Sequence, residues 1–467
     1  MSERTIPRPT TTAADDPRAT VERLRRTFRT GRTRSYEWRE EQLAGLARLV
    51  EENEDRIAEA LHADLGRTRA EAWLGDISST TGEIAYARKH LRRWMRKRRS
   101  PLPLNQRPAS AWIQYDPLGT VLIIGPWNYP VYLVLSPLVA ALAAGDCVVV
   151  KPSELAPACS SLMAELLPRY VDPQAVAVVE GDGAVTQELL SLGFDHALFT
   201  GGTEIGRKIM AGAAPTLTPV TLELGGKSPV IVHEDADLEV AARRIAWLKL
   251  MNSGQTCIAP DFVLVHRSVR ERFVEILRTT LTEFTADRDG AGLRIVNRRQ
   301  FDRLASYLDR TGGTVALGGT VDAERLEIAP TVVLDPAPDD AVMVEELFGP
   351  ILPVITYAAL ADAIDYIEER PKPLALYCFT SDRAVRDRVA QVSAGGVVFN
   401  HIAMHVLVPQ LPFGGVGDSG MGAYHGEWGF QTFSHRKSVL AKTVWPDPRF
   451  VYPPYTDKAL RLMRRFF

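Results

Sequence analysis

The stretch TVLIIGPWNYPVYLVLSPLVAALAAGDCVVVKPSE, residues 120–154, decides the fold class of this chain. It joins a β-branched apolar run (120–124) to a helix-length apolar segment (131–144) and then to a second β-branched run (147–150). Two such runs on either side of a helix are typical of a βαβ unit with parallel strands. The alternation continues through 175–179, 196–200 and 220–224, and it predicts a parallel, doubly wound sheet.

A second α/β series begins after Ser228 and predicts a second parallel sheet. Its apolar runs, separated mostly by helix-length segments, lie at 229–232, 262–266, 331–334, 352–356, 374–380 and 396–400. Helices over 35–65 and 71–98 are expected ahead of the first sheet, the former because its apolar residues recur at helical spacing. The simplest arrangement for this order is two α/β domains with a cleft between them.

Composition and charge argue against several classes of protein. The chain has 467 residues and a formal net charge of −2, which gives no reason to expect a nucleic acid as partner. The basic run 88–99 is therefore interpreted as a solvated helix end. The apolar stretch 131–150 contains Pro137, Gly145 and Asp146, so a helix followed by a buried strand is favoured over a membrane span. Residues 1–16 lack the apolar segment of a secretory signal, and a cytoplasmic protein is expected.

The four cysteines predict free thiols and a single reactive one. Their positions, 147, 159, 257 and 378, fit neither a disulfide framework nor a metal clip, so no metal is expected. Cys257 follows the polar, glycine-containing segment NSGQT (252–256), which can present a thiolate to a substrate. Cys147 and Cys378 lie in apolar runs and Cys159 on a predicted helix, so all three are expected to be inert.

Glu223 is the candidate general base. It lies between two leucines at the end of an apolar run, just before Gly225 and Gly226. Apolar surroundings raise the pKa of a carboxyl group, which suits it to accept a proton near neutral pH. Without Cys257, the sequence supports two roles for Glu223 equally, a general base and a partner of Lys227 in an ion pair at a sheet edge.

Polar and glycine residues follow three predicted strands, at the sheet edge where α/β proteins bind ligands. Asn128, in PWNYP, can donate an amide hydrogen to an oxyanion, or it can cap a turn. The segment GGTEIG (201–206) opens a helix and suits a phosphate group, although its spacing differs from the usual dinucleotide motif. Lys151 and Glu154 offer a charge pair able to hold ribose hydroxyls.

In their order along the chain, these segments resemble the aldehyde dehydrogenase superfamily, and within it the class 3-like branch that includes fatty-aldehyde and coniferyl-aldehyde dehydrogenases. The resemblance runs from about residue 20 to about residue 455. It is carried by PWNYP (126–130), KPSE (151–154), FTGGTEIG (199–206), LELGGKSP (222–229), NSGQTCIAPD (252–261), EELFGP (345–350), LPFGGVGDSGMGAYHG (411–426) and TFSHRKS (432–438). The last two segments are similar to class 3 members in particular.

The resemblance implies roles for individual residues. Cys257 would be the nucleophile, Glu223 the base that activates water for thioester hydrolysis, and Asn128 an oxyanion donor beside the Cys257 backbone N–H. The cofactor would be held by Trp127, Lys151, Glu154, Gly201, Gly202, Thr203, Gly206, Glu346 and Phe348. NAD is the expected cofactor and NADP the second option, because the Glu154 carboxylate suits a free ribose 2′-hydroxyl.

The resemblance also implies the fold and the assembly, an aldehyde dehydrogenase-like α/β fold in a homodimer. The expected parts are an NAD(P)-binding domain (18–99 and 118–222), a catalytic domain (223–405), bridging segments (100–117 and 406–450) and a C-terminal tail (451–467). The basic, amphipathic residues 458–467 are expected to form a short helix near the substrate entrance or the partner subunit. Contact with a membrane surface is the less favoured option.

Three positions depart from the family pattern. Gly202 stands where many members carry Ser or Asn, which removes one phosphate contact, Leu250 replaces a frequent Phe, and His401 stands where relatives often have Asp. The expected substrate is a medium- or long-chain aliphatic or an aromatic aldehyde. Its binding site is expected to be lined by Tyr129, Tyr132 and Leu411.

Three other functions are weighed against aldehyde oxidation. A CoA-acylating enzyme can dispense with the water-activating carboxylate, and Glu223 argues against it. A cofactor-independent thiol hydrolase would leave KPSE and EELFGP without a purpose. A non-catalytic relative typically loses the nucleophile or the cofactor motifs, and this chain keeps both.

Overall fold

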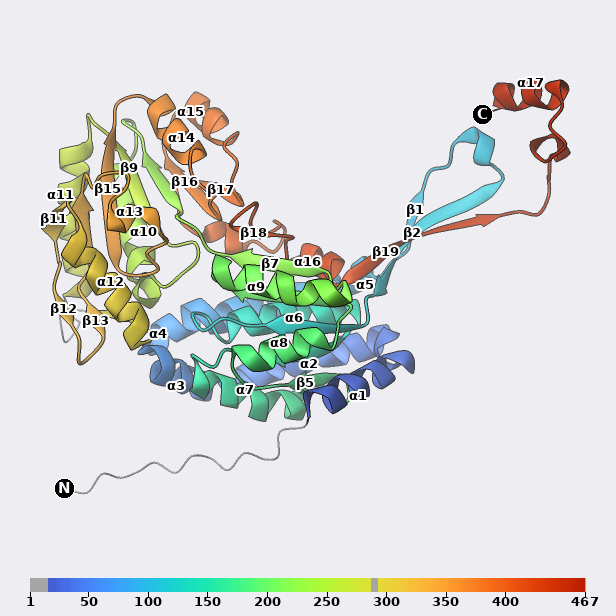
Figure 1. The fold of residues 1–467 in the computed structure, drawn as a ribbon, viewed down its shortest axis with the longest axis horizontal. Helices are drawn as coiled ribbons and strands as arrows, with labels where there is room; N and C mark the ends of the chain where they lie inside the picture. The colour runs from blue at the N-terminus through green and yellow to red at the C-terminus, as the bar shows by residue number, and fades with distance from the viewer. Residues whose placement is uncertain (1–15, 287–292, 467) are drawn as a thin grey trace.

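Two largely parallel sheets form the body of the molecule (Figure 1). The structure is a computed structural model that describes residues 16–286 and 293–466, so the expectations for residues 1–15 and for Phe467 lie outside it. Within this part of the chain, the first sheet has the order β18–β7–β6–β3–β4–β5, and β18 alone runs antiparallel. Its strands are β3 (Thr120–Ile124), β4 (Cys147–Lys151), β5 (Val176–Val178), β6 (His196–Gly201), β7 (Val220–Leu224) and β18 (Gly420–Met421).

The strand order of the first sheet reverses between β3 and β6. The chain runs outward from β3 to β5 and then returns through β6 to β7 on the other side. Open α/β sheets bind ligands beyond the carboxyl ends of their strands at such a reversal. Asn128 follows β3 and Gly202 follows β6, so both lie at this point. The connecting helices are α6 (Tyr132–Ala144), α7 (Pro157–Tyr170), α8 (Gly183–Ser191) and α9 (Thr203–Ala213).

The apolar stretch 131–150 forms helix α6 followed by strand β4, as expected. Every residue of both elements except Lys151 is apolar or small, and all of them are buried. A helix that is apolar on all sides needs protein around it, and α6 has α2 (Tyr36–Glu52), α5 (Ser78–Trp94) and the sheet as neighbours. The central strands are apolar along their whole length because both faces of a parallel sheet are covered.

The second sheet has the order β11–β14–β15–β9–β8–β16–β17, with β11 alone antiparallel. Its strands are β8 (Pro229–Val232), β9 (Phe262–His266), β11 (Thr314–Leu317), β14 (Thr331–Leu334), β15 (Ile351–Tyr357), β16 (Ala375–Phe379) and β17 (Gly396–Phe399). Its helices are α10 (Leu238–Leu250), α11 (Arg270–Thr285), α12 (Arg298–Arg310), α13 (Ala341–Val344), α14 (Leu360–Glu368) and α15 (Arg383–Val389). A small sheet joins β10 (Leu293–Arg294), β12 (Val321–Asp322) and β13 (Glu327–Ile328). The predicted fold class is confirmed.

The N-terminal helices depart from the predicted bounds. After α1 (Pro17–Arg29), the expected helix over 35–65 is divided at Asn53 into α2 and α3 (Glu54–Leu65). The helix expected over 71–98 consists of α4 (Arg69–Ala72), a wider π-helical turn (Trp73–Ile77) and α5, and residues 98–100 form β1 instead. π-Turns carry one extra residue and often mark functional sites.

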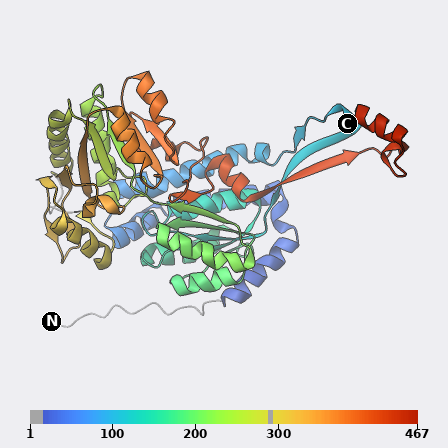
Figure 2. The ribbon, with the colours of Figure 1, turned by 45° about the horizontal axis from the view of Figure 1, so that its top comes forward.

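Three strands form an arm that extends from the body (Figures 1 and 2). In it, β2 (Ala109–Pro117) pairs antiparallel with β1 (Arg98–Ser100) and with β19 (Ser434–Lys442). The expected bridging segment 406–450 is divided, because β18 joins the first sheet and α16 (Gly426–Thr432) packs against α5 and α6.

The C-terminal tail forms the expected short helix, α17 (Asp457–Phe466). The arm carries α17 away from the body of its own subunit (Figure 2). In the part of the chain that the structure describes, no helix is both long and apolar enough to span a bilayer. The division into domains stays a prediction.

Candidate active site

Cys257 follows a tight turn at the C-terminal end of α10. Three consecutive residues of this turn, Asn252, Ser253 and Gly254, have φ angles of 50°, 59° and 72°. The left-handed region is unfavourable for residues other than glycine, so tertiary contacts must hold the turn. The Asn252 amide donates to the carbonyl oxygens of Gln255 at 3.0 Å and of Asn128 at 2.9 Å. The turn is thereby fastened to the segment after β3.

The Cys257 thiol lies in an electrostatic setting unlike that of the other cysteines. Burial and the negative charges of Glu223 and Glu346 raise its pKa well above the ordinary value, while the backbone N–H groups of Cys257 and Ile258 lower it. The thiol is therefore protonated at neutral pH, and it must lose its proton before the sulfur can react as a thiolate. The other three cysteines are free and buried, as expected, whereas Cys257 is only partly buried.

Glu223 lies at the end of β7 and is 1% exposed. Among the described residues, neither of its carboxylate oxygens has a hydrogen-bond partner. Burial, and secondarily the charge of Glu346, raise the pKa of Glu223 well above the ordinary value. The alternative ion pair with Lys227 is not formed, because Lys227 pairs with Asp261 and donates to two backbone carbonyls. An unpartnered carboxyl group of raised pKa can take a proton from a molecule that approaches it.

Asn128 faces the nucleophile segment and does not cap its own turn. Its amide nitrogen donates to the Gln255 carbonyl at 3.1 Å. An amide carries two N–H groups, so one of them is left for an oxyanion formed at Cys257. The interpretation of Asn128 as a turn cap is therefore not supported.

The residues predicted to hold a dinucleotide lie at the carboxyl ends of β4 and β6. Helix α9 begins after Gly202 without a side-chain cap, and a Cβ atom added at Gly202 would meet only open space. Free N–H groups at a helix start favour a phosphate. Gly206 lets this helix lie close to β7, since an added Cβ would come within 2.7 Å of Leu224 Cδ2. At the end of β4, Lys151 Nζ pairs with Glu154 Oε2 at 2.9 Å.

The remaining predicted cofactor residues border the same region. The rings of Trp127 and Phe348 contact edge to face, with 5.4 Å between centroids. The Glu346 carboxylate lies against Gly225, where an added Cβ would overlap it, and burial raises its pKa to about 8. Gly201 packs against the Phe199 ring, and Thr203 Oγ1 donates to the Asp418 carbonyl at 3.2 Å. These residues fit the ribose and phosphate groups of a dinucleotide.

The predicted substrate residues are divided by the structure. Tyr129 and Tyr132 are buried in one cluster with Leu133, and Tyr129 Oη lies 2.8 Å from Thr256 Oγ1, next to Cys257. A cavity of about 200 Å³ is lined by Ser78, Ser79, Gly82, Glu83, Tyr132, Val406, Leu407 and Pro409. Leu411 is 47% exposed and is absent from that lining. No sequence motif indicates that Ser78, Ser79, Val406 and Leu407 line this cavity.

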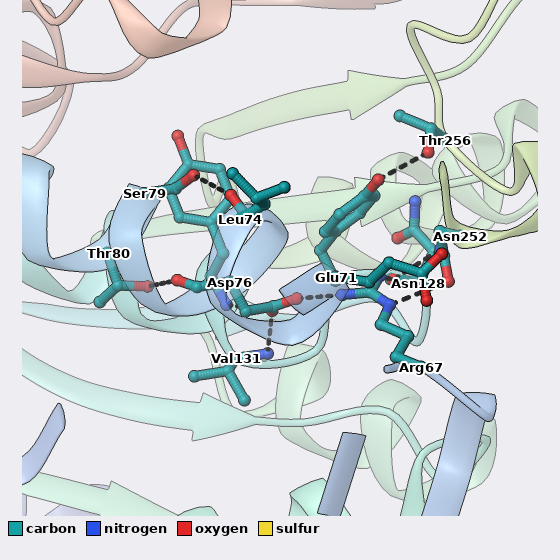
Figure 3. A network of polar contacts seen from close by, with 12 residues as sticks. Arg67, Glu71, Leu74, Asp76, Ser79, Thr80, Asn128, Val131, Asn252 and Thr256 are labelled. Carbon is teal, nitrogen blue, oxygen red and sulfur yellow. Dashed lines mark hydrogen bonds and ion pairs between the residues drawn. The ribbon is translucent and has the colours of Figure 1, made fainter. Parts of the chain in front are cut away.

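Sequence reasoning missed the polar network behind the site, which Figure 3 shows. Arg67 lies between Asp76 on one side and Asn128 and Asn252 on the other. Its partners are 9, 61 and 185 residues away along the chain, so no local motif could have indicated them.

Comparisons with known proteins agree with this geometry. A family model described as the aldehyde dehydrogenase family matches residues 1–439. The chain is 45% identical over 453 residues to aldehyde dehydrogenase family 3 member H1 of Arabidopsis thaliana, covering 95% of this chain and 93% of that protein. It is 43% identical to the dimeric NADP-preferring aldehyde dehydrogenase of Rattus norvegicus, covering 95% and 98%. The solved substrate-bound state of Staphylococcus aureus AldH superposes with a TM-score of 0.92 at 40% identity, covering 96% and 99%.

Proposed function

This chain belongs to the aldehyde dehydrogenase family, and we propose that it oxidises a medium- or long-chain aliphatic or an aromatic aldehyde through a thioester on Cys257. Membership makes it an NAD(P)-dependent oxidoreductase that converts an aldehyde to the carboxylic acid. The observation that carries the proposed mechanism is that the charge of Glu223, a buried carboxyl group with no hydrogen-bond partner among the described residues, acts on the Cys257 thiol.

The first half of the reaction forms a bond between Cys257 and the substrate. The thiol gives up its proton to a water molecule and its sulfur adds to the aldehyde carbon, so that the carbonyl oxygen becomes an oxyanion. The free N–H of the Asn128 amide can donate to that oxyanion. The cofactor residues described above would hold NAD(P), which would supply the acceptor for the hydride that leaves the substrate carbon, and Cys257 would be left with a thioester.

The second half releases the acid. Glu223 takes a proton from water, the hydroxide adds to the thioester carbon, and the sulfur leaves as the Cys257 thiolate. Both the unpartnered oxygens and the raised pKa of Glu223 support this role. An acyl transfer to CoA would need no such base, which disfavours the CoA-acylating alternative.

The walls of the site support the proposed substrate class. Tyr129, Tyr132 and Leu133 supply an aromatic and aliphatic surface beside Cys257, and Val406 and Leu407 extend it at the neighbouring cavity. Such a surface favours apolar chains and rings because they lose water on binding. A series of aldehydes of increasing length should show kcat/KM rising with each CH2 group until the cavity is filled. A preference for short, polar aldehydes would contradict this assignment.

We also propose a homodimer formed through the arm. The arm projects from the body, so strands β2 and β19 have little of their own chain around them (Figure 1). Leu440, Val444 and Trp445 are exposed on it. A second copy of the chain would cover these apolar side chains, and the rat relative is named as dimeric.

The mechanism is tested by comparing the variants Glu223→Gln and Cys257→Ala. Glutamine has nearly the shape of glutamate but accepts no proton, so Glu223→Gln should form NADH once per site and then turn over about 10²- to 10⁴-fold more slowly. Intact mass should show an acyl group on Cys257. Cys257→Ala should bind NAD and form neither NADH nor an adduct.

Two results would contradict the proposal. Appreciable aldehyde oxidation by Cys257→Ala would remove Cys257 as nucleophile. Unchanged turnover in Glu223→Gln would remove Glu223 from the mechanism. A Glu223→Gln variant with neither burst nor adduct would instead assign Glu223 to the earlier step, the deprotonation of Cys257.

A further inference from the structure

Arg67 is a buried arginine that the proposed chemistry does not use. Its side chain is 2% exposed and pairs with Asp76, which is fully buried. Isolating two charges from water is costly, and such a pair persists only where its hydrogen bonds are complete. Its contacts therefore show what the pair holds in place.

On one side, the pair is anchored to the start of helix α6. Asp76 lies in the π-helical turn Trp73–Ile77, and one of its oxygens accepts from the backbone N–H groups of Val131 at 3.1 Å and Tyr132 at 2.8 Å. Its other oxygen accepts from Arg67. Asp76 thus fixes the guanidinium relative to the loop between β3 and α6, as Figure 3 shows.

On the other side, Arg67 bonds to both segments of the candidate active site. Its Nε donates to Asn252 Oδ1 at 3.0 Å, and its Nη2 donates to the Asn128 carbonyl oxygen. The guanidinium also lies over the Tyr129 ring, 4.2 Å from the centroid, and the Tyr129 hydroxyl contacts Thr256. One side chain therefore joins the turn before Cys257 to the segment that carries the Asn128 amide.

We propose that Arg67, oriented by Asp76, is a positioning residue that holds the left-handed turn at Asn252 and keeps Cys257 in register with the Asn128 amide. This inference rests on the proposed roles of Cys257 and Asn128. Asn252 and Ser253 would leave the left-handed region if the turn were released, and Cys257 would move with them. A displacement of about 1 Å at reacting groups can cost roughly 100-fold in rate.

The test is the variant Arg67→Lys, with Arg39→Lys as the matched control. Lysine keeps the charge but has no planar fork, so it cannot bond Asp76, Asn128 and Asn252 together. Arg39 is equally buried and donates to the carbonyl oxygens of Thr33 and Ala143, remote from Cys257. Arg67→Lys should lower kcat by about 10- to 100-fold with the KM for NAD little changed. Arg39→Lys should lower the unfolding temperature and leave kcat unaltered.

A second measurement does not depend on the aldehyde reaction. The rate of alkylation of Cys257 by iodoacetamide, followed by peptide mass, reports the ionisation of the thiol. In Arg67→Lys the N–H groups of Cys257 and Ile258 lose their alignment with the sulfur, so the pH profile of alkylation should move to higher pH. Asn252→Ala removes the amide contacts without removing a charge and keeps the strain of a positive φ, so it should give the same shift even if Arg67→Lys folds poorly.

The outcomes separate the two proposals. If Arg67 acts through Asn252, the two substitutions Arg67→Lys and Asn252→Ala break the same connection. The variant that carries both should then turn over no more slowly than the slower of the two single variants. Additive losses of kcat in the double variant would overturn the positioning role. The same holds if Arg67→Lys has the kcat and the alkylation profile of Arg39→Lys. A shifted profile with unchanged kcat would uphold the positioning of Cys257 and contradict its role as nucleophile.

Discussion

Glu223 combines a position in a strand with a carboxyl group that has no partner among the described residues. A buried carboxylate costs free energy, so the folded state holds a proton on Glu223 more tightly than the unfolded chain does. The same burial that raises its pKa would suit the residue to its proposed role as a base, and it makes the residue a source of instability. At Glu223, the proposed function and the stability of the fold therefore make opposite demands.

This conflict predicts a pH-dependent effect of Glu223→Gln on stability. Because the folded pKa is raised, the wild-type chain should lose free energy of unfolding as pH rises above about 4.5, the ordinary glutamate value, toward the folded pKa. Glutamine does not ionise, so the variant should escape that loss. Its unfolding temperature relative to wild type should increase between pH 5 and pH 9. A difference that stays constant over that range would show that Glu223 does not hold a proton in the folded state.

The side chain of Glu154 predicts a preference for NAD over NADP. Its carboxylate would bond a free ribose 2′-hydroxyl and repel a 2′-phosphate, so NAD should be used with a higher kcat/KM than NADP. Glu154→Gln removes the repulsion and frees Lys151, and it should raise kcat/KM for NADP roughly tenfold, or about 1.4 kcal/mol. The control is Glu165→Gln on α7, which removes a carboxylate paired with Arg56 of α3. Equal efficiency with both cofactors in the wild-type chain would contradict the preference.

At the scale of elements, the short strand β18 secures the strand that carries Glu223. Gly420 lies opposite Glu223 in the antiparallel pair β18–β7 and has a φ of 138°. A Cβ atom there would overlap the carbonyl oxygen of Leu222. A segment nearly 200 residues away along the chain thus covers the edge of β7, and the close approach requires glycine.

The close approach predicts a large effect of Gly420→Ala. The new methyl group must both strain the backbone and push β18 from β7, which should cost roughly 2–5 kcal/mol of stability. Chemical denaturation would measure it, and turnover should fall as Glu223 shifts. Gly183→Ala is the contrasting variant: Gly183 is exposed at the start of α8 with open space around it, so alanine should stabilise the chain by about 0.4–1 kcal/mol. Equal effects of the two substitutions would exclude the proposed contact.

At the scale of the whole molecule, the arm and the tail are the parts with the fewest contacts to the body (Figure 2). Their exposed apolar side chains include Val444 and Trp445. Exposed apolar groups gathered on one projection are typical of a surface that another protein covers.

The arm predicts an effect on assembly. The wild-type chain should have a mass of twice 51.6 kDa by light scattering, and deletion of residues 443–467 should shift it toward the monomer. Leu217→Ser removes an equally exposed apolar side chain from the body and should leave the mass unchanged. A wild-type chain that is monomeric at micromolar concentration would exclude the proposed dimer.

Local pattern alone determined the parallel sheets, because apolar runs of strand length and helical segments alternate along the chain and each reports its own burial. Short motifs likewise mark Cys257, which follows a turn after a helix, and Glu223 and the glycine segment 201–206, which stand at strand ends. Helix bounds were less well predicted: the break at Asn53 and the π-turn at 73–77 depend on packing that periodicity does not report.

Only the tertiary structure decided how these motifs are held together. Arg67, Asp76 and Asn252 are joined by contacts across up to 185 residues, and Gly420 is set against Glu223 by the pairing of two distant strands. The choice between a Glu223–Lys227 ion pair and an unpartnered Glu223 was likewise open until Lys227 was found bonded to Asp261. The physical reason is that a side chain's hydrogen bonds and pKa depend on which groups surround it in space, and neighbours along the chain supply only a few of them.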